Sequence, residues 1–184
     1  MKTNVTAVMV EEHKLILRMI ALLEENVQRL EARQPVPWRF FLDGVDFIRN
    51  YADRFHHAKE EDVLFVALVA NGMPEQNSPV AAMQMAHDQG RAFVRAMEAA
   101  AQRALAGEAG QEGAIIENAR GYITLLRDHI DKEDSILYPL AERVLPQEPR
   151  PAMVDSYRSA EARMPGLEEK YRRLVEGWEA KTAA

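Results

Sequence analysis

The chain has 184 residues, of which 47% are apolar, and its formal net charge is -6. A chain of this length can bury a substantial core as one domain, and its acidic balance argues against a nucleic-acid-binding surface. It has no cysteine, which excludes disulfides and thiolate metal sites. Residues 1–10 lack the features of a signal peptide, and no apolar run is long enough to cross a bilayer. We therefore expect a cytoplasmic protein that binds neither nucleic acid nor a membrane.

Four long segments carry the periodicity of α-helices, because apolar residues recur in them at steps of three and four. The apolar stripes run from Met9 to Leu30, from Phe41 to Ala67, from Val80 to Ala101 and from Ile115 to Leu140. Glycine and proline gather between the segments, and no segment alternates apolar and polar residues as a surface strand would. Four helices joined by short loops predict an all-α fold, an up-down-up-down antiparallel four-helix bundle over residues 1–146.

A further helical segment follows in residues 147–184, and it is interrupted near Pro165. Its apolar stripe consists of Leu167, Tyr171, Leu174 and Trp178. This additional C-terminal helical segment either packs on the bundle, which we favour, or forms the contact of a homodimer.

The most informative feature is a repeated pattern, His-x-x-Lys-Glu-acid-x-apolar-Leu-aromatic, in residues 56–65 and 129–138. Residues four apart lie on one face of an α-helix, one turn from each other. Each copy can therefore direct one imidazole and one carboxylate toward the same point. The two pairs are His56 with Glu60 and His129 with Glu133.

Histidines also interrupt the apolar stripes of the first and third segments, at His13 and His87. In an antiparallel bundle with a rise of about 1.5 Å per residue, these histidines lie at a similar depth to the two repeated pairs. Burying carboxylates and imidazoles together would cost several kcal/mol per uncompensated charge unless a cation shares the cavity. Lys59 and Lys132 do not supply that charge, because each precedes a glutamate and should point about 100° away around the helix. The convergence predicts a metal site.

The donor types restrict which metal fits. Nitrogen and oxygen ligands without sulfur suit iron, manganese or zinc, and six donors are more than one zinc ion normally uses. Two ions bridged by carboxylates would use all six and leave positions open for a small diatomic ligand. A ferritin-like centre expects Glu-x-x-His, a spacing that the chain lacks. Considered alone, a histidine on an apolar stripe is more often a hydrogen-bonded core residue, and a lone His-x-x-x-Glu is an ordinary surface pair.

Over residues 8–144 the chain resembles the hemerythrin-like, or HHE cation-binding, domains. The resemblance rests on Glu12-His13, on His56 to Glu61 with Leu64-Phe65, on His87 with Gly90-Arg91, and on His129 to Glu133 with Leu137-Tyr138-Pro139. It implies a four-helix bundle with a non-haem centre of two iron ions, bridged by two glutamates and an oxo or hydroxo group. By position, the implied iron ligands are His13, His56, Glu60, His87, His129 and Glu133, with the two glutamates as bridges.

Residues beside these positions have more than one interpretation. His57 and Glu61 either support the ligands or are solvated, and His57 would become an additional ligand if its helix is slightly rotated. Glu12, Asp88 and Asp128 are expected to be exposed charges, although one of them could orient an imidazole by accepting its free N–H.

One departure from the oxygen-carrying hemerythrins is Arg91, which replaces their second histidine on the third helix. The chain therefore looks more like the branch of the family implicated in sensing oxygen or nitric oxide, handling iron, or answering oxidative and nitrosative stress. We expect a di-iron protein whose partner is a diatomic ligand, oxygen or nitric oxide. The alternative is a di-iron enzyme acting on oxygen, peroxide or nitric oxide. For that alternative the sequence offers only Tyr122 as a candidate redox-active neighbour, and a core role for Tyr122 is the simpler interpretation.

Overall fold

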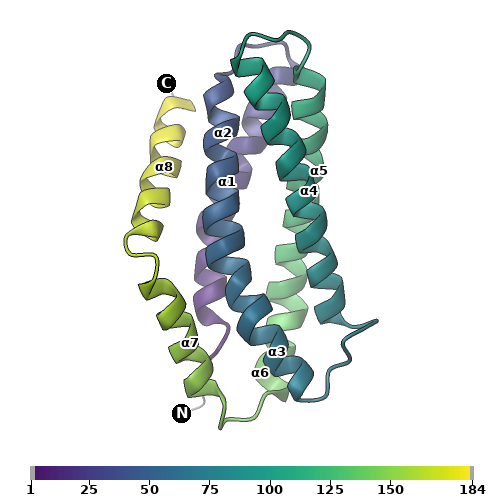
Figure 1. Ribbon diagram of the computed structural model, residues 1–184, viewed down its shortest axis with the longest axis vertical. Coiled ribbons are helices and arrows are strands. Elements are labelled where there is room, and N and C mark those ends of the chain that lie inside the picture. The colour runs from purple at the N-terminus through teal and green to yellow at the C-terminus, as the bar shows by residue number, and fades with distance from the viewer. Residues whose placement is uncertain (1–2, 183–184) are drawn as a thin grey trace.

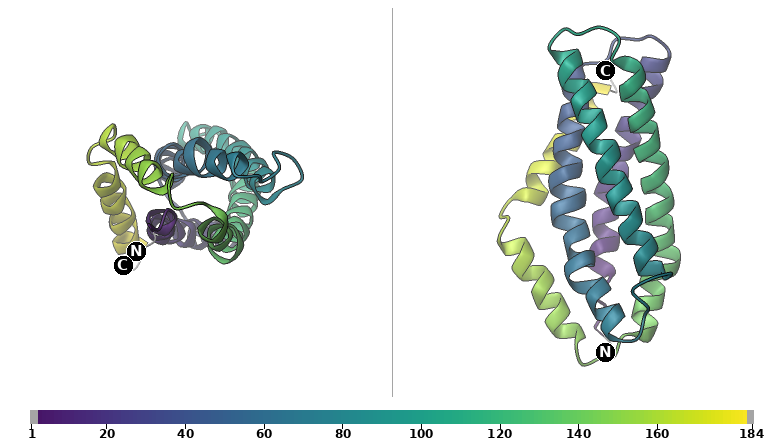
Figure 2. Two further views of the ribbon diagram at one scale, coloured as in Figure 1. Left: turned by 90° about the horizontal axis from the view of Figure 1, so that it is seen from below. Right: turned by 45° about the vertical axis from the view of Figure 1, so that its right-hand side comes forward.

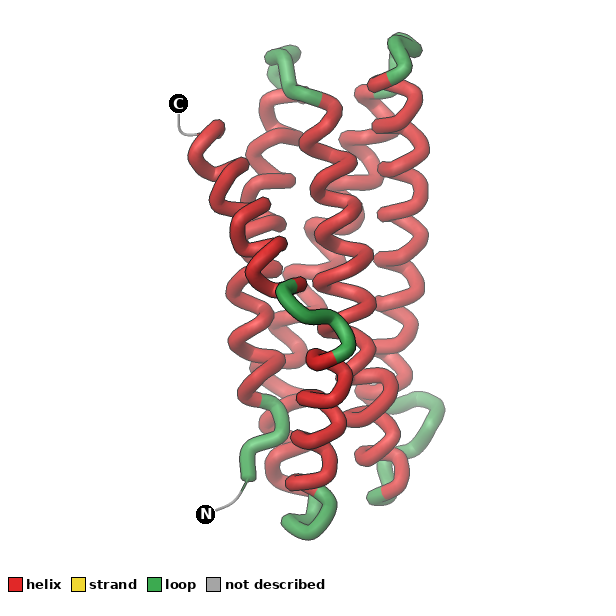
Figure 3. The backbone as a smooth tube through the Cα atoms, turned by 60° about the vertical axis from the view of Figure 1, so that its left-hand side comes forward, coloured by secondary structure: helices red, strands yellow, loops and turns green. Residues whose placement is uncertain are grey.

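The structure, a computed structural model, describes residues 3–182, and these form helices and loops without any strand (Figure 3). Residues 1–2 and 183–184, at the outer ends of the predicted domain and tail, lie outside the described part. The all-α fold predicted from the periodicity is confirmed for the described residues. Within this part of the chain, no helix combines the length and apolar character needed to traverse a bilayer.

Four long helical rods form the bundle, and the chain runs along successive rods in alternating directions (Figure 1). The first rod is α1 (Ala7–Glu31) and the third is α4 (Pro79–Leu105). The second comprises α2 (Trp38–Phe47), η1 (Ile48–His57), η2 (Glu60–Leu64) and α3 (Phe65–Ala70). The fourth comprises α5 (Glu112–Lys132), η3 (Glu133–Leu137) and α6 (Tyr138–Val144). The label η marks π-helical turns.

The rods begin and end at residues whose chemistry suits those positions. Ser78 caps α4 by accepting a hydrogen bond from the backbone N–H of Ala81 at 3.2 Å. Pro79 follows in the first turn, where its missing N–H is not needed. Gly72 and Gly107 follow the second and third rods with positive φ, which glycine adopts without strain. These boundaries set the depth of each side chain in the bundle.

A polar layer divides the apolar core into two clusters. Helix α1 passes from one cluster at Met9 to the other at Leu15, and α4 passes from Met83 to Val94. The second and fourth rods pass between the same two clusters. The predicted histidines lie between the clusters, so close packing on both sides fixes their depth.

The C-terminal segment folds into α7 (Arg150–Ala162) and α8 (Leu167–Thr182), which lie along one side of the bundle (Figure 2). Tyr171 and Trp178 of α8 are buried in the larger apolar cluster. Trp178 Nε1 also donates a hydrogen bond to Asp43 at 3.2 Å. In this structure the tail stripe packs on its own bundle, and a homodimer contact stays a prediction.

The sequence analysis did not single out a close helix approach at Gly121 on α5. A Cβ atom at this position would lie 2.5 Å from the ring of Phe93 on α4. Helices α4 and α5 can therefore approach this closely only because residue 121 has no side chain. These two helices also carry His87 and His129.

Candidate metal centre

The structure brings all six predicted ligand residues together in the polar layer. Each of them is at most 3% exposed. They come from all four rods: His13 from α1, His56 and Glu60 from the second rod, His87 from α4, and His129 and Glu133 from the fourth rod. Their convergence at one depth agrees with the antiparallel arrangement, and their role as ligands depends on the geometry of the donor atoms.

π-helical turns accompany the ligand candidates in both repeats. His56 lies in η1, Glu60 begins η2 and Glu133 begins η3. The plain α-helical spacing assumed in the sequence analysis is therefore only approximate here. A π turn holds more residues than an α turn, so adjacent side chains diverge by a smaller angle. This explains why His57 is buried beside His56, at 6% exposure, and π turns of this kind are frequent at functional sites.

Two pairs of imidazoles face each other through their Nε2 atoms. The Nε2 atoms of His13 and His56 are 3.0 Å apart, and those of His87 and His129 are 3.1 Å apart. Two nitrogens that bind one ion at about 2.1 Å and at right angles are about 3.0 Å from each other. Without a cation or a proton between them, the two lone pairs of each pair would repel. Both spacings fit two neighbouring ligands of one ion.

Glu133 reaches one histidine of each pair with a different oxygen. Its Oε1 lies 3.0 Å from His129 Nε2, and its Oε2 lies 3.4 Å from His13 Nε2. Neither oxygen has a partner with hydrogen-bond geometry among the described residues. Burial alone would raise the pKa of Glu133, but the contacts from His129 and His13 outweigh burial and lower it, so the carboxylate is charged. A buried, charged carboxylate placed in this way fits a bridge between two cations.

Glu60 approaches both histidine pairs from the other repeat. Its Oε2 lies 3.8 Å from His56 Nε2 and 3.5 Å from His87 Nε2, and it has no hydrogen-bond partner among the described residues. Its Oε1 accepts a hydrogen bond of 2.5 Å from the hydroxyl of Tyr138. Burial and the nearby Glu133 raise the pKa of Glu60 well above its usual range. Without metal, this shift favours the neutral carboxyl of Glu60, and a cation would take the place of its proton.

The donor atoms form two groups. One consists of His13, His56 and Glu133, and the other consists of His57, Glu60, His87 and His129. Within each group, one donor atom from every residue lies within 4.8 Å of those of the others. Imidazole nitrogen and carboxylate oxygen without sulfur fit iron, manganese or zinc. The arrangement therefore fits two ions that share carboxylates and keep coordination positions open.

Residues 4–141 match the family model described as the hemerythrin HHE cation-binding domain. The chain belongs to the hemerythrin HHE family. The matched region contains all six ligand candidates and ends before α7 and α8. The resemblance inferred from the motifs is thus confirmed, and cation binding is the property that the family description states.

Similar curated proteins include uncharacterized proteins from two strains of Mycobacterium tuberculosis and one strain of Mycobacterium bovis. Each is 23% identical to this chain over 137 residues, which cover 74% of this chain and 53% of the relative. The chain thus spans about half the length of these curated relatives. No solved structure matches the chain.

In this hemerythrin HHE chain, both repeats use the acid after the glutamate to hold a histidine of another rod. His13 Nδ1 donates a hydrogen bond to Asp134 at 2.9 Å, and His87 Nδ1 donates to Glu61 at 2.6 Å. Each bond orients the ring and leaves the Nε2 lone pair free for an ion. The sequence analysis considered Glu61 for this supporting role but missed Asp134, although the repeat places the two acids at equivalent positions.

His56 is held by a buried chain of charged groups. Its Nδ1 donates a hydrogen bond to Glu12 at 2.9 Å, and Glu12 accepts a second bond from Lys59. Lys59 is 1% exposed and also pairs with Glu161 of α7 at 2.8 Å. The expectation that Glu12 is an exposed charge was therefore wrong, because docking of Lys59 under α7 buries the pair. Through Glu161, the C-terminal segment contributes to the position of a ligand candidate.

This support is absent at His129, whose Nδ1 has no partner among the described residues. Helix α4 has Ala86 at the position before its histidine, where α1 has Glu12, so no carboxylate reaches His129 from there. Asp88 and Asp128, the other acids considered for orienting an imidazole, form surface ion pairs instead.

Tyr138 is a residue of the site that the sequence analysis quoted only as part of a motif. Its ring stacks on His13 at 5.6 Å between centroids, as its repeat counterpart Phe65 stacks on His87 at 5.9 Å. The Tyr138 hydroxyl also lies 3.5 Å from His13 Nε2. Tyr122, the tyrosine considered from the sequence, borders an adjacent cavity instead. The repeated aromatic position was the signal that pointed to Tyr138.

Arg91 bridges two acidic residues of the second rod. Its guanidinium donates hydrogen bonds to Asp53 at 2.7 and 3.0 Å and to Glu61 at 2.7 Å. Asp53 in turn accepts a bond of 3.4 Å from His57 Nδ1. Burial lowers the pKa of His57, so its imidazole is neutral, and its ring stacks on His87 at 3.7 Å between centroids. His57 is therefore a candidate ligand for the position at which Arg91 replaces a histidine.

Proposed function

We propose that this chain is a non-haem di-iron protein that binds or senses oxygen or nitric oxide, or handles iron in a stress response. The observation that carries the proposal is the pair of Nε2 spacings, 3.0 and 3.1 Å, with Glu133 reaching both histidine pairs. In this proposal His13 and His56 hold one ion, and His87 and His129 hold the other.

Iron is favoured over zinc among the ions that the donor set suits. Imidazole and carboxylate donors alone would also accept manganese or zinc. Zinc has no redox chemistry, however, whereas binding of oxygen or nitric oxide requires an ion that can share or transfer electrons. The chain's own contribution is to position the donors through Glu12, Asp134 and Glu61 and to exclude bulk water by burying them.

A second candidate function, a di-iron enzyme acting on oxygen, peroxide or nitric oxide, is favoured by Tyr138. Its hydroxyl contacts Glu60 at 2.5 Å and lies 3.5 Å from His13 Nε2. Burial raises the pKa of Tyr138 well above its usual range, so the phenol keeps its proton. A protonated phenol at this place could donate a proton to a ligand at the metal centre.

Anaerobic reconstitution with ferrous iron, followed by optical spectra after addition of oxygen, nitric oxide or peroxide, tests both candidates. A stable adduct formed once per centre supports binding or sensing. Consumption of many equivalents per centre supports the enzyme. Protein that retains no stoichiometric iron contradicts both, and the exposed variant Lys14→Ala serves as the control for His13→Ala, which should lose iron.

A further inference from the structure

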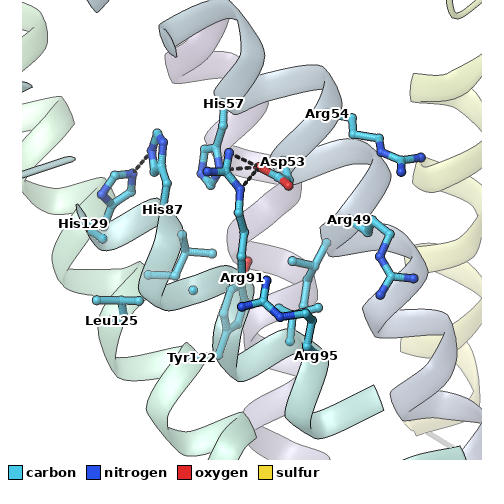
Figure 4. A pocket seen from close by; sticks show the side chains of 15 residues that line it. Arg49, Asp53, Arg54, His57, His87, Arg91, Arg95, Tyr122, Leu125 and His129 are labelled. Carbon is cyan, nitrogen blue, oxygen red and sulfur yellow. Dashed lines mark hydrogen bonds and ion pairs between the residues drawn. The ribbon is translucent and has the colours of Figure 1, made fainter. Parts of the chain in front are cut away.

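A cavity of about 240 Å³ borders the histidine pair of α4 and α5 (Figure 4). The side chains of His57, His87 and His129 lie at one end of it, and Arg49 and Arg54 lie at the other. One water molecule takes about 30 Å³ in the liquid, so a diatomic molecule would fill only a small part of this space. The cavity has room for a ligand of several non-hydrogen atoms.

Tyr122 lines the cavity, and its buried hydroxyl has no hydrogen-bond partner among the described residues. The residue is only 2% exposed, and burial raises the pKa of the phenol, so the hydroxyl stays a donor. Buried polar groups in native proteins nearly always have a partner, and those without one need an explanation. A ligand that brings an acceptor oxygen into the cavity would supply it.

Four arginines border the cavity, but Asp53 is its only acidic lining residue. Arg91 and Arg49 are already held by carboxylates. Arg54 and Arg95 are exposed, and neither pairs with a carboxylate among residues 3–182. In a chain with a net charge of -6, two guanidinium groups without a carboxylate partner among the described residues favour an anionic ligand beside the cavity.

Apolar side chains form much of the cavity wall, chiefly Ile48, Val94 and Leu125. Gly90 also lines the cavity, and a Cβ atom there would be in van der Waals contact with the Tyr122 ring at 3.5 Å and with Leu125 at 3.6 Å, so a larger side chain at this position would occupy the space. An inorganic anion would leave these apolar walls without a matching surface.

We propose that the cavity binds a short-chain carboxylate that carries a second oxygen. The anionic head pairs with Arg54 or Arg95, the carbon chain lies against the apolar walls, and the second oxygen accepts a hydrogen bond from Tyr122. This inference names a ligand class for the metal centre proposed above and depends on that centre for any chemistry. Binding itself is measurable both with and without iron.

Calorimetric titration of the full chain with matched pairs of acids tests the proposal. Each pair joins an oxo acid to a methyl-branched acid with the same number of non-hydrogen atoms, such as 4-oxopentanoate and 4-methylpentanoate, with the substituted carbon varied along the chain. Where the carbonyl reaches Tyr122, we expect the oxo acid to bind about fivefold more tightly. The variant Tyr122→Phe should lose this preference while it still binds the branched acid.

The arginine contribution is tested by the double variant Arg54→Gln with Arg95→Gln, which should weaken both acids about tenfold. The control is Arg103→Gln with Arg143→Gln, the same charge change at exposed positions that do not line the cavity, and it should leave affinity unchanged. Gly90→Leu fills the cavity and should abolish acid binding while the protein still retains iron.

Equal affinity for oxo and branched acids at every carbonyl position would overturn the inference, as would an undiminished affinity in the double arginine variant. The two proposals fail separately. Acid binding by a protein that retains no iron contradicts the metal centre and supports the cavity. Iron retention without acid binding supports the metal centre and contradicts the cavity.

Discussion

Replacing Glu60 with glutamine separates the stability of the metal-free protein from the stability that metal adds. Glu60 is completely buried, and its raised pKa favours the neutral carboxyl without metal. Glutamine has nearly the same shape as that neutral form, and its amide oxygen can still accept the hydrogen bond from Tyr138. The free energy of unfolding of the metal-free variant should therefore stay within about 1 kcal/mol of the unsubstituted chain.

The metal-loaded proteins should differ far more. An ion present at 100 times its Kd adds about 2.7 kcal/mol to the stability, so two ions add about 5 kcal/mol. For a chain of this size, about 1 kcal/mol corresponds to about 2–4 °C in Tm, and two ions should raise Tm by about 10–20 °C. A neutral amide is a weaker ligand than a carboxylate that both ions share. Glu60→Gln should therefore lose at least half of this rise.

Thermal melts followed by circular dichroism, without metal and with ferrous iron under anaerobic conditions, measure both quantities. The matched control is Asp62→Asn, which removes the same charge from an exposed position of η2 and should keep the full metal-dependent rise. A Glu60→Gln protein with the full rise would refute the bridging role. A metal-free variant that melts far below the unsubstituted chain would refute the neutral state inferred for Glu60.

Three further outcomes are expected. Burial opposes the charge of His13, but its two carboxylate partners outweigh burial and raise its pKa above the usual 6.5. Because the metal must displace that proton, the affinity for ferrous iron should still rise with pH above 6.5. Calorimetry in buffers of different ionisation enthalpy should detect the released proton, and its absence would count against His13 as a ligand. Tyr138→Phe removes a buried hydrogen bond and should lower the free energy of unfolding in denaturant melts by about 1–2 kcal/mol. The control Tyr157→Phe should lower it by less, because the buried hydroxyl of Tyr157 has no partner among the described residues. Glu161→Ala removes the ion pair between Glu161 and buried Lys59, so the free energy of unfolding should fall by about 1–3 kcal/mol. An unchanged midpoint of urea unfolding would contradict this expectation.

The helical bundle and the convergence of the six candidates were predictable because both follow from local spacing. Apolar residues at steps of three and four define the rods, and a rise of about 1.5 Å per residue places side chains from different rods at one depth. Boundary errors of a few residues move a side chain by about one turn, which is small compared with the bundle length. Two copies of the repeat then identified His56 with Glu60 and His129 with Glu133.

Contacts between rods were harder to predict, because they depend on how distant segments dock. Lys59 was expected to point away from the buried cluster, but the structure buries it against Glu12, and its second partner is Glu161 in a helix outside the bundle. The π turns were not visible in the apolar periodicity, so the inward position of His57 stayed an alternative. Asp134 was missed because its partner belongs to a different rod, although comparison with Glu61 at the same repeat position could have identified it.

The central claim is that each pair of imidazoles holds one ion and that the two ions share two carboxylates. Anomalous diffraction at the iron absorption edge, from crystals of the anaerobically reconstituted protein, tests it most directly. The account predicts two peaks about 3.5–4 Å apart, one beside the Nε2 atoms of His13 and His56 and one beside those of His87 and His129. A single peak, no peak in this layer, or iron bound elsewhere on the chain would contradict it.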